Sequence, residues 1–367
     1  MSNLVRNLSE QLDAGIARLV ACAALTPCRC NVPHSWYLVV ASLLRRIYFS
    51  SVRIVGSPLK ARARARQIII SSHRNGAIDG YAVIHAFPRA RFLVSAQLLR
   101  NALLRLMFGG IPVVREKDRA RYGMRAADHA NPILVACRHV RDGGSLAMFP
   151  EGSSEWGPRP LPYETGTARI VRMLMSEGVA VEVVPVGLFY RCPDRFRSAL
   201  EILVGEPVAL PEQGGGDKRE WERRIHEALT QALDAVSVDC ADVASFERVE
   251  RLAAADADNG GSYALAFKRY ERGDAKMRVE AQAVRTPFWR FLCGLPGMVL
   301  LAPVLLVGYL AGRKANSRNT VAFFRMAGGF AASLIWLPIL LVLLFIFPLP
   351  TLLLLAIAVL GWPAFRR

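Results

Sequence analysis

A histidine and an aspartate that follow an apolar run are the residues of this sequence best suited to chemistry. In SSHRNGAIDG, residues 71–80, His73 and Asp79 come directly after the apolar stretch QIII. A carboxylate beside an imidazole fixes its tautomer and stabilises the imidazolium, which is how a general base is usually arranged. A purely structural pair would show the same spacing. Because the chain lacks a nearby Gly-x-Ser-x-Gly sequence, we expect His73 to activate a substrate hydroxyl rather than a protein serine.

The segment around this pair alternates between strand and helix patterns from residue 51 to residue 210. QIIISS, RFLVSA, IPVVR, VEVVPVGLFY and ALEILVGEPV have the composition of strands, and helical patterns lie between most of them. This alternation predicts an α/β domain with a mixed sheet flanked by helices. His73 and Asp79 would then lie at the carboxyl end of a buried strand, where ligands bind in open α/β sheets.

Three further segments surround this domain. Residues 1–50 predict an N-terminal helical segment, in which HSWYLVVASLLRRIYFS is either a core helix or a helix lying in a membrane interface. Residues 211–285 contain charged amphipathic helices, which we interpret as a helical extension of the domain. Residues 286–367 have the composition of a membrane-embedded region with two to three hydrophobic segments.

The hydrophobic segments near the carboxyl end leave the membrane topology open. Residues 291–310 and 327–365 carry no charged side chain. Since about 20 apolar residues span a bilayer, candidate spans lie at 291–310 and 328–347, with a short third piece, TLLLLAIAVLGW. The loop between them contains Arg313, Lys314, Arg318 and Arg325 and no acid.

The positive-inside rule keeps such a loop cytoplasmic, whereas a span at 291–310 would carry it away from the catalytic domain. A re-entrant hairpin bent at Pro296 or Pro303 removes this conflict. Two buried core helices are the alternative to membrane segments.

The charge balance predicts a polyanionic partner. Lysine and arginine total 47 against 30 acids, a net charge of +17. Nucleic acid, an anionic membrane or a phosphate-bearing substrate would suit this surplus. Nucleic-acid binding favours aromatic residues among the basic ones, and KARARAR (60–66) has none, so we expect no nucleic acid. The seven cysteines form no Cys-x-x-Cys pair, and we expect no metal.

Four blocks in sequence order carry a family resemblance. They are the His73–Asp79 stretch, GGIPVVR (109–115), FPEGSS (149–154) and VVPVGLFY (183–190). With them, roughly residues 50–210 resemble the PlsC-type glycerophospholipid acyltransferase family. The resemblance implies a glycerol-3-phosphate acyltransferase-like fold. It also implies transfer of an acyl chain from acyl-CoA or acyl carrier protein, as co-substrate, to a hydroxyl of glycerol-3-phosphate or a lysophospholipid, without a cofactor.

The resemblance also implies roles for single residues. His73 matches the catalytic base and Asp79 its carboxylate partner. Arg115 matches a residue that holds the acceptor's phosphate. Glu151 and Gly152 match a turn that contributes to acceptor binding, and backbone N–H groups near it could meet the oxyanion of the thioester adduct. Pro185 matches the proline near the acyl donor.

Two departures from the family pattern concern the acceptor. Five residues instead of four separate His73 from Asp79, as in the glycerol-3-phosphate or dihydroxyacetone-phosphate branch, and Asn75 sits where that branch has an asparagine. In the third block, Ser153 and Ser154 stand where threonine and arginine are common. We place Ser153 with the acceptor-binding residues. Arg74, Lys117 or Arg159 would then replace the missing arginine as phosphate ligand.

The sequence therefore predicts a membrane-bound O-acyltransferase whose catalytic domain lies on the cytoplasmic face, with an apolar tunnel for the acyl chain. The alternative is a non-catalytic membrane protein that binds anionic lipid through its basic surface. A hydrolase using the same residues is a third possibility. Acceptor identity, acyl-chain length, the choice between CoA and carrier protein, and oligomeric state stay open.

Overall fold

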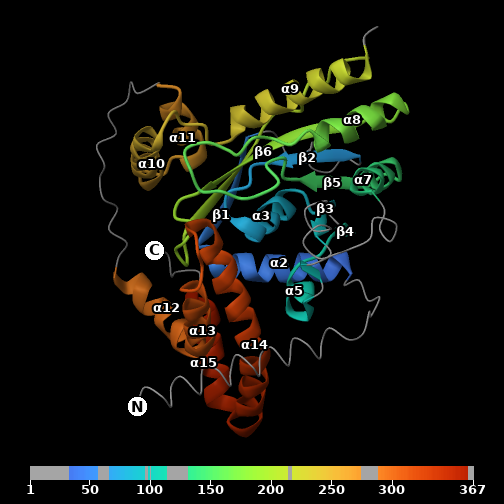
Figure 1. The fold of residues 1–367 in the computed structure, drawn as a ribbon. Coiled ribbons are helices and arrows are strands. Elements are labelled where there is room, and N and C mark those ends of the chain that lie inside the picture. Colours follow the sequence, from blue (N-terminus) through green and yellow to red (C-terminus); the bar gives the residue numbers. More distant parts are fainter. Residues whose placement is uncertain are drawn as a thin grey trace, which may run out of the picture.

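A seven-stranded sheet lies between layers of helices in the computed structural model (Figure 1). The structure describes residues 33–56, 66–95, 98–99, 101–113, 131–213, 217–273 and 288–362. The strands are β1 (Ser51–Gly56), β2 (Gln67–Ser71), β3 (Ala90–Ser95), β4 (Ile111–Val113), β5 (Ser145–Met148), β6 (Glu182–Tyr190) and β7 (Ala199–Val204). Their order is β1-β7-β6-β2-β5-β3-β4, and all neighbours are parallel except the antiparallel pair β6 and β7. The predicted mixed α/β fold is confirmed.

The helices fall into two sets, one around the sheet of the α/β domain and one at the carboxyl end of the chain. The first comprises α2 (His34–Tyr48), α3 (Asp79–Ala86), α5 (Ala102–Met107), α7 (Pro132–Arg141), α8 (Gly166–Ser176), α9 (Lys218–Val236), α10 (Val243–Asp258) and α11 (Tyr263–Glu271). The second comprises α12 (Phe288–Leu300), α13 (Ala302–Gly312), α14 (Val321–Ile346) and α15 (Pro348–Gly361). Two short 3₁₀ turns, η2 (Gly76–Ile78) and η4 (Arg318–Thr320), precede α3 and α14.

Helices bury both faces of the sheet. Because the side chains of a strand point alternately to the two faces, one strand contributes to both cores. In β2, Ile69 joins the hydrophobic core formed with α2, α3 and α14. Ile68 and Ile70 join the core on the other face, formed with α7 to α11. This two-sided burial explains why β2 reads as an unbroken apolar run instead of an alternating one. The strand ends at Ser71, directly before His73.

The N-terminal helix α2 is half core and half surface. Tyr37, Val40 and Leu44 are buried in the core beneath the sheet, whereas Trp36, Val39 and Leu43 are exposed. The core interpretation therefore holds for one side of the helix, and a position in a membrane interface stays a prediction for the other side. The structure ties α2 into the core of the α/β domain, and the domain boundary at residue 50 stays a prediction.

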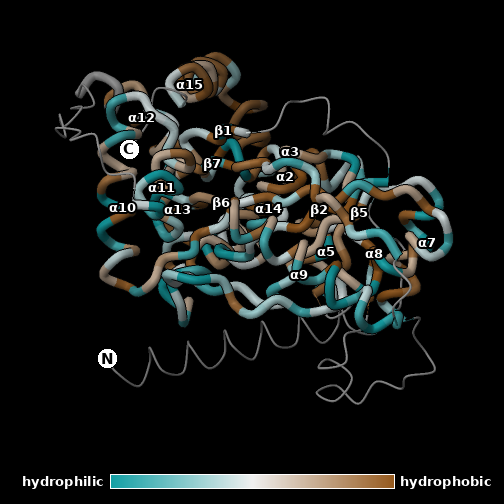
Figure 2. The backbone as a smooth tube through the Cα atoms, turned by 90° about the horizontal axis from the view of Figure 1, so that it is seen from above, coloured by the Kyte–Doolittle hydropathy of each residue, from teal (hydrophilic) through white to brown (hydrophobic). Residues whose placement is uncertain are grey.

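The helices α9, α10 and α11 cover one face and one edge of the sheet. Trp221, Ile225 and Phe267 from this group are buried in the core shared with β2 and β6. Figure 2 shows hydrophilic and hydrophobic stretches alternating along α10, as expected for amphipathic helices. The basic stretch 60–66 lies outside the described residues, apart from Arg66.

The C-terminal helices show how residues 291–310 fold. This segment is two helices, Leu292–Leu300 and Ala302–Gly312, bent by 81° at the break between them, which is the geometry of a broken span or of a re-entrant loop. The bend lies next to Pro303, one of the two prolines at which the hairpin alternative placed it. Within the described part of the chain, Arg318–Ile346 is the single helical segment that is long and apolar enough to cross a membrane by itself, and α15 is a shorter apolar helix.

Helix α9 crosses the sheet so closely that β6 requires a glycine. A Cβ added to Gly187 would lie 1.8 Å from the backbone oxygen of Val236, at the end of α9. Backbone cannot yield as a flexible side chain can, so Gly187→Ala should lower the free energy of unfolding by about 1–3 kcal/mol or more. Gly166→Ala is the control, since nothing lies within 4 Å of its added Cβ. Thermal unfolding of the detergent-solubilised protein measures both, and equal melting temperatures would contradict the prediction.

Candidate active site

The carboxylate of Asp79 organises the loop between β2 and α3. Asp79 is completely buried at the start of α3. Its Oδ2 lies 2.9 Å from Nδ1 of His73 and accepts the backbone N–H groups of Arg74 at 2.7 Å and Asn75 at 2.8 Å. Its Oδ1 accepts the hydroxyl of Tyr190 at 2.5 Å. A buried charge needs such a set of hydrogen bonds, because desolvation without them is costly.

The longer spacing between histidine and aspartate has a local cause. The five intervening residues contain the η2 turn, which Gly76 begins with a left-handed φ of +57°. Glycine adopts this conformation at no steric cost. The turn folds the chain back so that Asp79 meets the imidazole. The predicted pairing of His73 with Asp79 is therefore present in the structure.

The imidazole of His73 is fixed on several sides. Since a carboxylate only accepts, Nδ1–H donates to Asp79 and Nε2 carries the lone pair of a base. The ring stacks on Phe149 with 4.2 Å between centroids, and Phe149 stacks in turn on Phe92 at 5.3 Å. The side chain is 16% exposed. A ring held this way cannot rotate freely, yet it keeps access to solvent.

Glu151 supports the backbone of His73 and does not face an open surface. One of its carboxylate oxygens accepts the N–H of His73 at 2.7 Å, and the other accepts that of Leu161 at 3.1 Å. Burial raises the pKa of Glu151, and the two N–H donors act in the opposite direction. Glu151 thus joins the FPEGSS turn to the catalytic loop. Its predicted contact with the acceptor stays a prediction.

The FPEGSS turn exposes Gly152 and Ser153 beside this contact. Gly152 adopts a left-handed φ of +65°, and its N–H donates to the carbonyl of Phe149 at 3.0 Å. That N–H group is therefore bonded within the turn, and the expectation that backbone N–H groups near the turn meet an oxyanion stays a prediction. Ser153 is exposed on the turn, and its predicted role at the acceptor stays untested.

Arg74 is adjacent to His73 but is buried in an aromatic environment. Its guanidinium lies 4.5 Å from the ring centre of Trp156 and 5.6 Å from that of Phe246, and it donates to the carbonyl of Gly157 at 3.0 Å. Burial lowers its pKa. With 3% exposure, it forms part of the wall of the site in this structure. A role as phosphate ligand stays a prediction.

Two of the remaining predicted residues, Pro185 and Arg159, have other partners in the domain. Pro185 lies buried inside β6, paired with Ile70, and its carbonyl accepts the N–H of Gly205 at 2.9 Å. Arg159 is largely exposed, and its Nε donates to the carbonyl of Cys240. Arg115 and Lys117 lie outside the described residues.

Tyr190 is a site residue that the sequence reasoning missed. It ends β6 and donates to Asp79, and burial raises its pKa well above the ordinary value, so its hydroxyl stays a proton donor. The sequence feature that could have identified Tyr190 is a hydroxyl at the carboxyl end of a strand next to β2.

Asn75 also has a buried amide whose two polar atoms find no partner among the described residues. Unpaired buried groups of this kind are uncommon and concentrate at functional sites.

A second missed residue comes from the membrane-like region. Asn319, in η4, is 6% exposed, and its amide donates to the backbone oxygen of Ser154 at 2.8 Å and to its hydroxyl at 3.1 Å. A Cβ added to Gly76 would lie 3.4 Å from the carbonyl oxygen of Asn319. The neighbouring Arg318 lies 5.2 Å above the ring of Trp156. The junction between α13 and α14 therefore forms one side of the candidate site.

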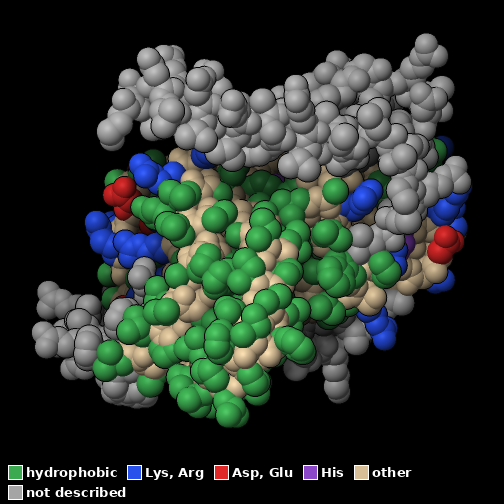
Figure 3. Space-filling model, turned by 90° about the horizontal axis from the view of Figure 1, so that it is seen from below, with side chains coloured by type: hydrophobic (Ala, Val, Ile, Leu, Met, Phe, Trp, Pro, Cys, Tyr) green, Lys and Arg blue, Asp and Glu red, His purple; other side chains and the backbone are tan. Residues whose placement is uncertain are grey.

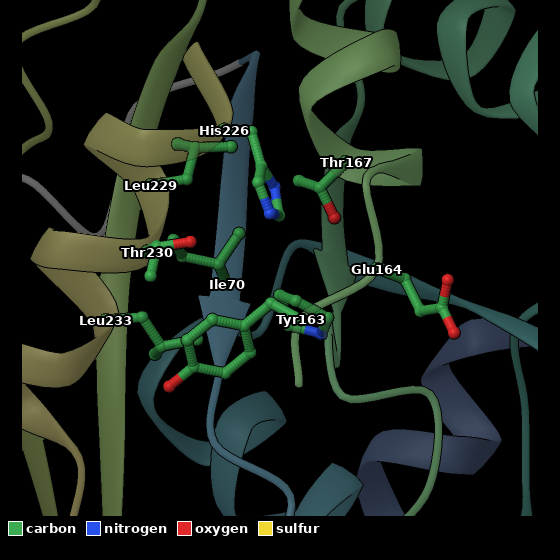
Figure 4. Close-up of a pocket in the computed structure, with 9 residues that line it drawn as sticks. Ile70, Tyr163, Glu164, Thr167, His226, Leu229, Thr230 and Leu233 are labelled. Carbon is green, nitrogen blue, oxygen red and sulfur yellow. The ribbon is translucent and has the colours of Figure 1, made fainter. Parts of the chain in front are cut away.

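His73 lines neither of two small hollows in the described part of the chain, each with room for about one water molecule. One lies between β2, α8 and α9, and its lining includes Tyr163, His226 and Leu233 (Figure 4). The other adjoins Arg74 and Trp156. The predicted acyl-chain tunnel stays a prediction.

Comparison with known proteins assigns the α/β region to a family. Residues 52–188 match the family model described as Acyltransferase. The chain is 25% identical over 122 residues to glycerol-3-phosphate O-acyltransferase 1 of Saccharomyces cerevisiae, covering 31% of this chain and 16% of that protein. It is 29% identical over 121 residues to glycerol-3-phosphate O-acyltransferase 2 of the same yeast, again covering 31% and 16%. An uncharacterized acyltransferase of Schizosaccharomyces pombe is 29% identical over 112 residues, covering 29% and 17%.

The match therefore spans about a sixth of the length of these curated relatives. Among solved structures, the 1-acyl-sn-glycerophosphate acyltransferase PlsC of Thermotoga maritima aligns with a TM-score of 0.35 and 15% identity, covering 59% of this chain and 88% of that chain. Residues 52–188 match the acyltransferase family model, and the predicted PlsC-type resemblance is confirmed. The names of the two yeast enzymes also agree with the glycerol-3-phosphate branch of the family.

Removing the hydroxyl of Tyr190 should impair the catalytic loop. In Tyr190→Phe, Oδ1 of Asp79 loses its donor, and a hydrogen bond to a charged group is worth about 1.5–3 kcal/mol. We expect turnover to fall about tenfold or more. Tyr163→Phe is a matched control, since it removes a comparable bond, 2.7 Å long, to Asp234. Turnover measured beside thermal stability separates the variants, and an equal effect of both on turnover would contradict the assignment.

Removing the amide of Asn319 should disturb the FPEGSS turn. Asn319→Ala leaves Ser154 without two hydrogen bonds, and we expect turnover to fall about tenfold, which corresponds to about 1.4 kcal/mol. Membrane association should not change. Asn316→Ala, in the exposed part of the same loop, is the control. Retention of full turnover by Asn319→Ala would show that this junction does not support the site.

Proposed function

We propose that this protein transfers a fatty acyl chain from an acyl thioester to a hydroxyl of glycerol-3-phosphate or a lysophospholipid. The His73–Asp79 pair carries the proposal, since its geometry is that of a general base oriented by a carboxylate. The family match of residues 52–188 supports acyl transfer, and the yeast relatives support glycerolipid synthesis. Acyl-CoA or acyl carrier protein would be the donor.

The reaction proceeds by direct transfer. Nε2 of His73 takes the proton of the acceptor hydroxyl while the alkoxide oxygen attacks the thioester carbonyl carbon. The tetrahedral adduct collapses with cleavage of the C–S bond, and the thiolate leaves with the proton held by the imidazolium. Asp79 stabilises the imidazolium in between, because its carboxylate lies 2.9 Å from Nδ1. No covalent acyl-enzyme is required.

The direction of substrate entry follows from the residues around the imidazole. Phe149, which stacks on His73, packs against the same core as Phe323 and Phe330 of α14. An acyl chain could therefore approach the base along apolar surface from the α14 side. The protein would work at a membrane with its catalytic domain on the cytoplasmic face, where the net charge of +17 favours anionic lipid.

Replacing His73 separates this proposal from a non-catalytic lipid-binding protein. His73→Ala should lower turnover at least a hundredfold, the usual contribution of a general base, while vesicle binding stays unchanged. His85→Ala, at the other end of α3, is the control and should retain turnover. Membranes containing each variant are assayed with radiolabelled acyl-CoA. Unchanged lipid acylation by His73→Ala would support the anionic-lipid-binding alternative.

The same assay identifies the acceptor. The panel contains glycerol-3-phosphate, dihydroxyacetone phosphate, a lysophospholipid and an amino-acid-based lyso-lipid, each with acyl-CoA and with acyl carrier protein as donor. We expect a labelled lipid only when an acceptor is present. Release of free fatty acid without acceptor would favour a hydrolase on the same residues.

A further inference from the structure

The helices α12 to α15 form two consecutive pairs, α12–α13, bent by 81°, and α14–α15, which we call the two hairpins. The segment that joins the two hairpins returns to the α/β domain. Residues 313–320 lead from α13 to α14. In this segment, Nε of Arg318 pairs with Asp194 at 3.0 Å, and Asn319 donates to Ser154. At the first turns of α14, Arg325 donates to the carbonyl of Asp194. The end of the first hairpin and the start of the second therefore lie on the same side, next to the site.

The far end of the second hairpin returns to the same side. The carbonyl of Trp362, directly after α15, accepts Nη2 of Arg197 at 3.2 Å, and the guanidinium lies 5.2 Å from its ring. Arg197 is 2% exposed and also donates to the carbonyls of Arg46 and Phe49, at the end of α2. One buried guanidinium thus joins α15 and α2 to the catalytic domain.

The parts of the hairpins that extend away from the domain are too short to cross a bilayer. The first half of α14 is docked, with Ala322 and Met326 buried in the core, and its exposed apolar side chains begin at Leu334. From Leu334 to Phe347, 14 residues rise about 21 Å, and α15 has the same length. α12 and α13, with 13 and 11 residues, rise about 20 and 17 Å. The hydrocarbon core is about 30 Å thick.

The surface of these hairpins suits lipid as its partner. Phe345 is 90% exposed, and Leu349 and Leu360 are each 80% exposed. Residues 326–362 contain no charged side chain. Seen from the hairpin side, apolar side chains cover the centre of the face and basic ones lie at its edge (Figure 3). In water, so large an exposed apolar surface would be unfavourable. Contact with the acyl chains of lipids removes that cost.

The contacts between the helices are also those of membrane segments. A Cβ added to Gly308 would lie 2.8 Å from the carbonyl oxygen of Arg325, and one added to Gly361 would lie 1.8 Å from that of Cys293. Small residues that let helices approach closely are typical of helix pairs in lipid.

We propose that α12–α13 and α14–α15 enter a lipid bilayer as two re-entrant hairpins from the side of the catalytic domain, and that none of these helices crosses it. The deepest points are then the bend at Leu301 and the turn at Phe347. This topology goes beyond the acyltransferase reaction. It replaces the predicted span at 328–347, and it keeps the basic loop 313–318 on the side where the positive-inside rule puts it.

Single cysteines test this topology in proteoliposomes of the full-length protein, in a background whose seven native cysteines are replaced. Leu349→Cys marks the turn of the second hairpin, Asn316→Cys marks the basic loop, and Asn259→Cys marks the catalytic domain. A membrane-impermeant maleimide is supplied from outside or enclosed inside. We expect Asn316→Cys and Asn259→Cys to react from the same side. We expect Leu349→Cys to react from neither side until the bilayer is dissolved.

The other labelling patterns overturn the proposal. Reaction of Leu349→Cys from the side opposite Asn259→Cys would mean that α14 crosses the bilayer. Its reaction from the same side before solubilisation would mean that the hairpin is not in lipid. A bimane dye on the same cysteine should be quenched by lipids brominated along the acyl chain, which separates lipid contact from burial in protein. An unquenched dye would also reject the proposal.

A second measurement does not depend on the cysteine-free background. An epitope tag is added after Arg367 of the native sequence, and proteases are applied to intact vesicles. We expect the tag to be cut from the same side as the catalytic domain. Cleavage only from the opposite side would overturn the proposal. Neither readout uses enzyme activity, so the topology and the acyltransferase function can fail separately.

Discussion

A buried carboxylate is the interaction on which the rest of this structure depends. Asp79 is completely enclosed, and an enclosed charge is tolerated only when hydrogen bonds replace its water. Its carboxylate accepts hydrogen bonds from Nδ1–H of His73, from two backbone N–H groups of the loop between β2 and α3, and from the hydroxyl of Tyr190. Satisfying this charge therefore fixes the loop after β2, the start of α3 and the end of β6 in one arrangement.

The surrounding elements fix the backbone of His73, just as Asp79 fixes its ring. Glu151 accepts its N–H, and the N–H of Glu155 donates to its carbonyl at 3.1 Å. The FPEGSS turn is held in turn by Asn319, at the junction of the two C-terminal hairpins. The chain of contacts from the imidazole to the membrane-like region is thus short, and under the proposed function it places His73 beside the proposed lipid-facing hairpins.

The C-terminal helices combine two physical environments in one segment. The first half of α14 is docked on the α/β domain, because Ala322 and Met326 are buried against it. The second half exposes apolar side chains in a region without charge. The hydropathy of the sequence records both halves as one continuous apolar stretch, since burial in protein and burial in lipid favour the same side chains.

The sequence alone determined the α/β class, the strand that precedes the site, and the pair of His73 and Asp79, because local periodicity and a short spacing encode them. It also indicated that residues 291–310 could bend at a proline. Only the tertiary structure decided which distant groups complete the site. Tyr190 reaches Asp79 from 111 residues away and Asn319 reaches Ser154 from 165 residues away, and pairings at such separations leave no local pattern. The same holds for Arg74, whose burial between aromatic rings depends on α10 folding over it, and for the first half of α14, whose docking depends on the α/β domain that packs against it.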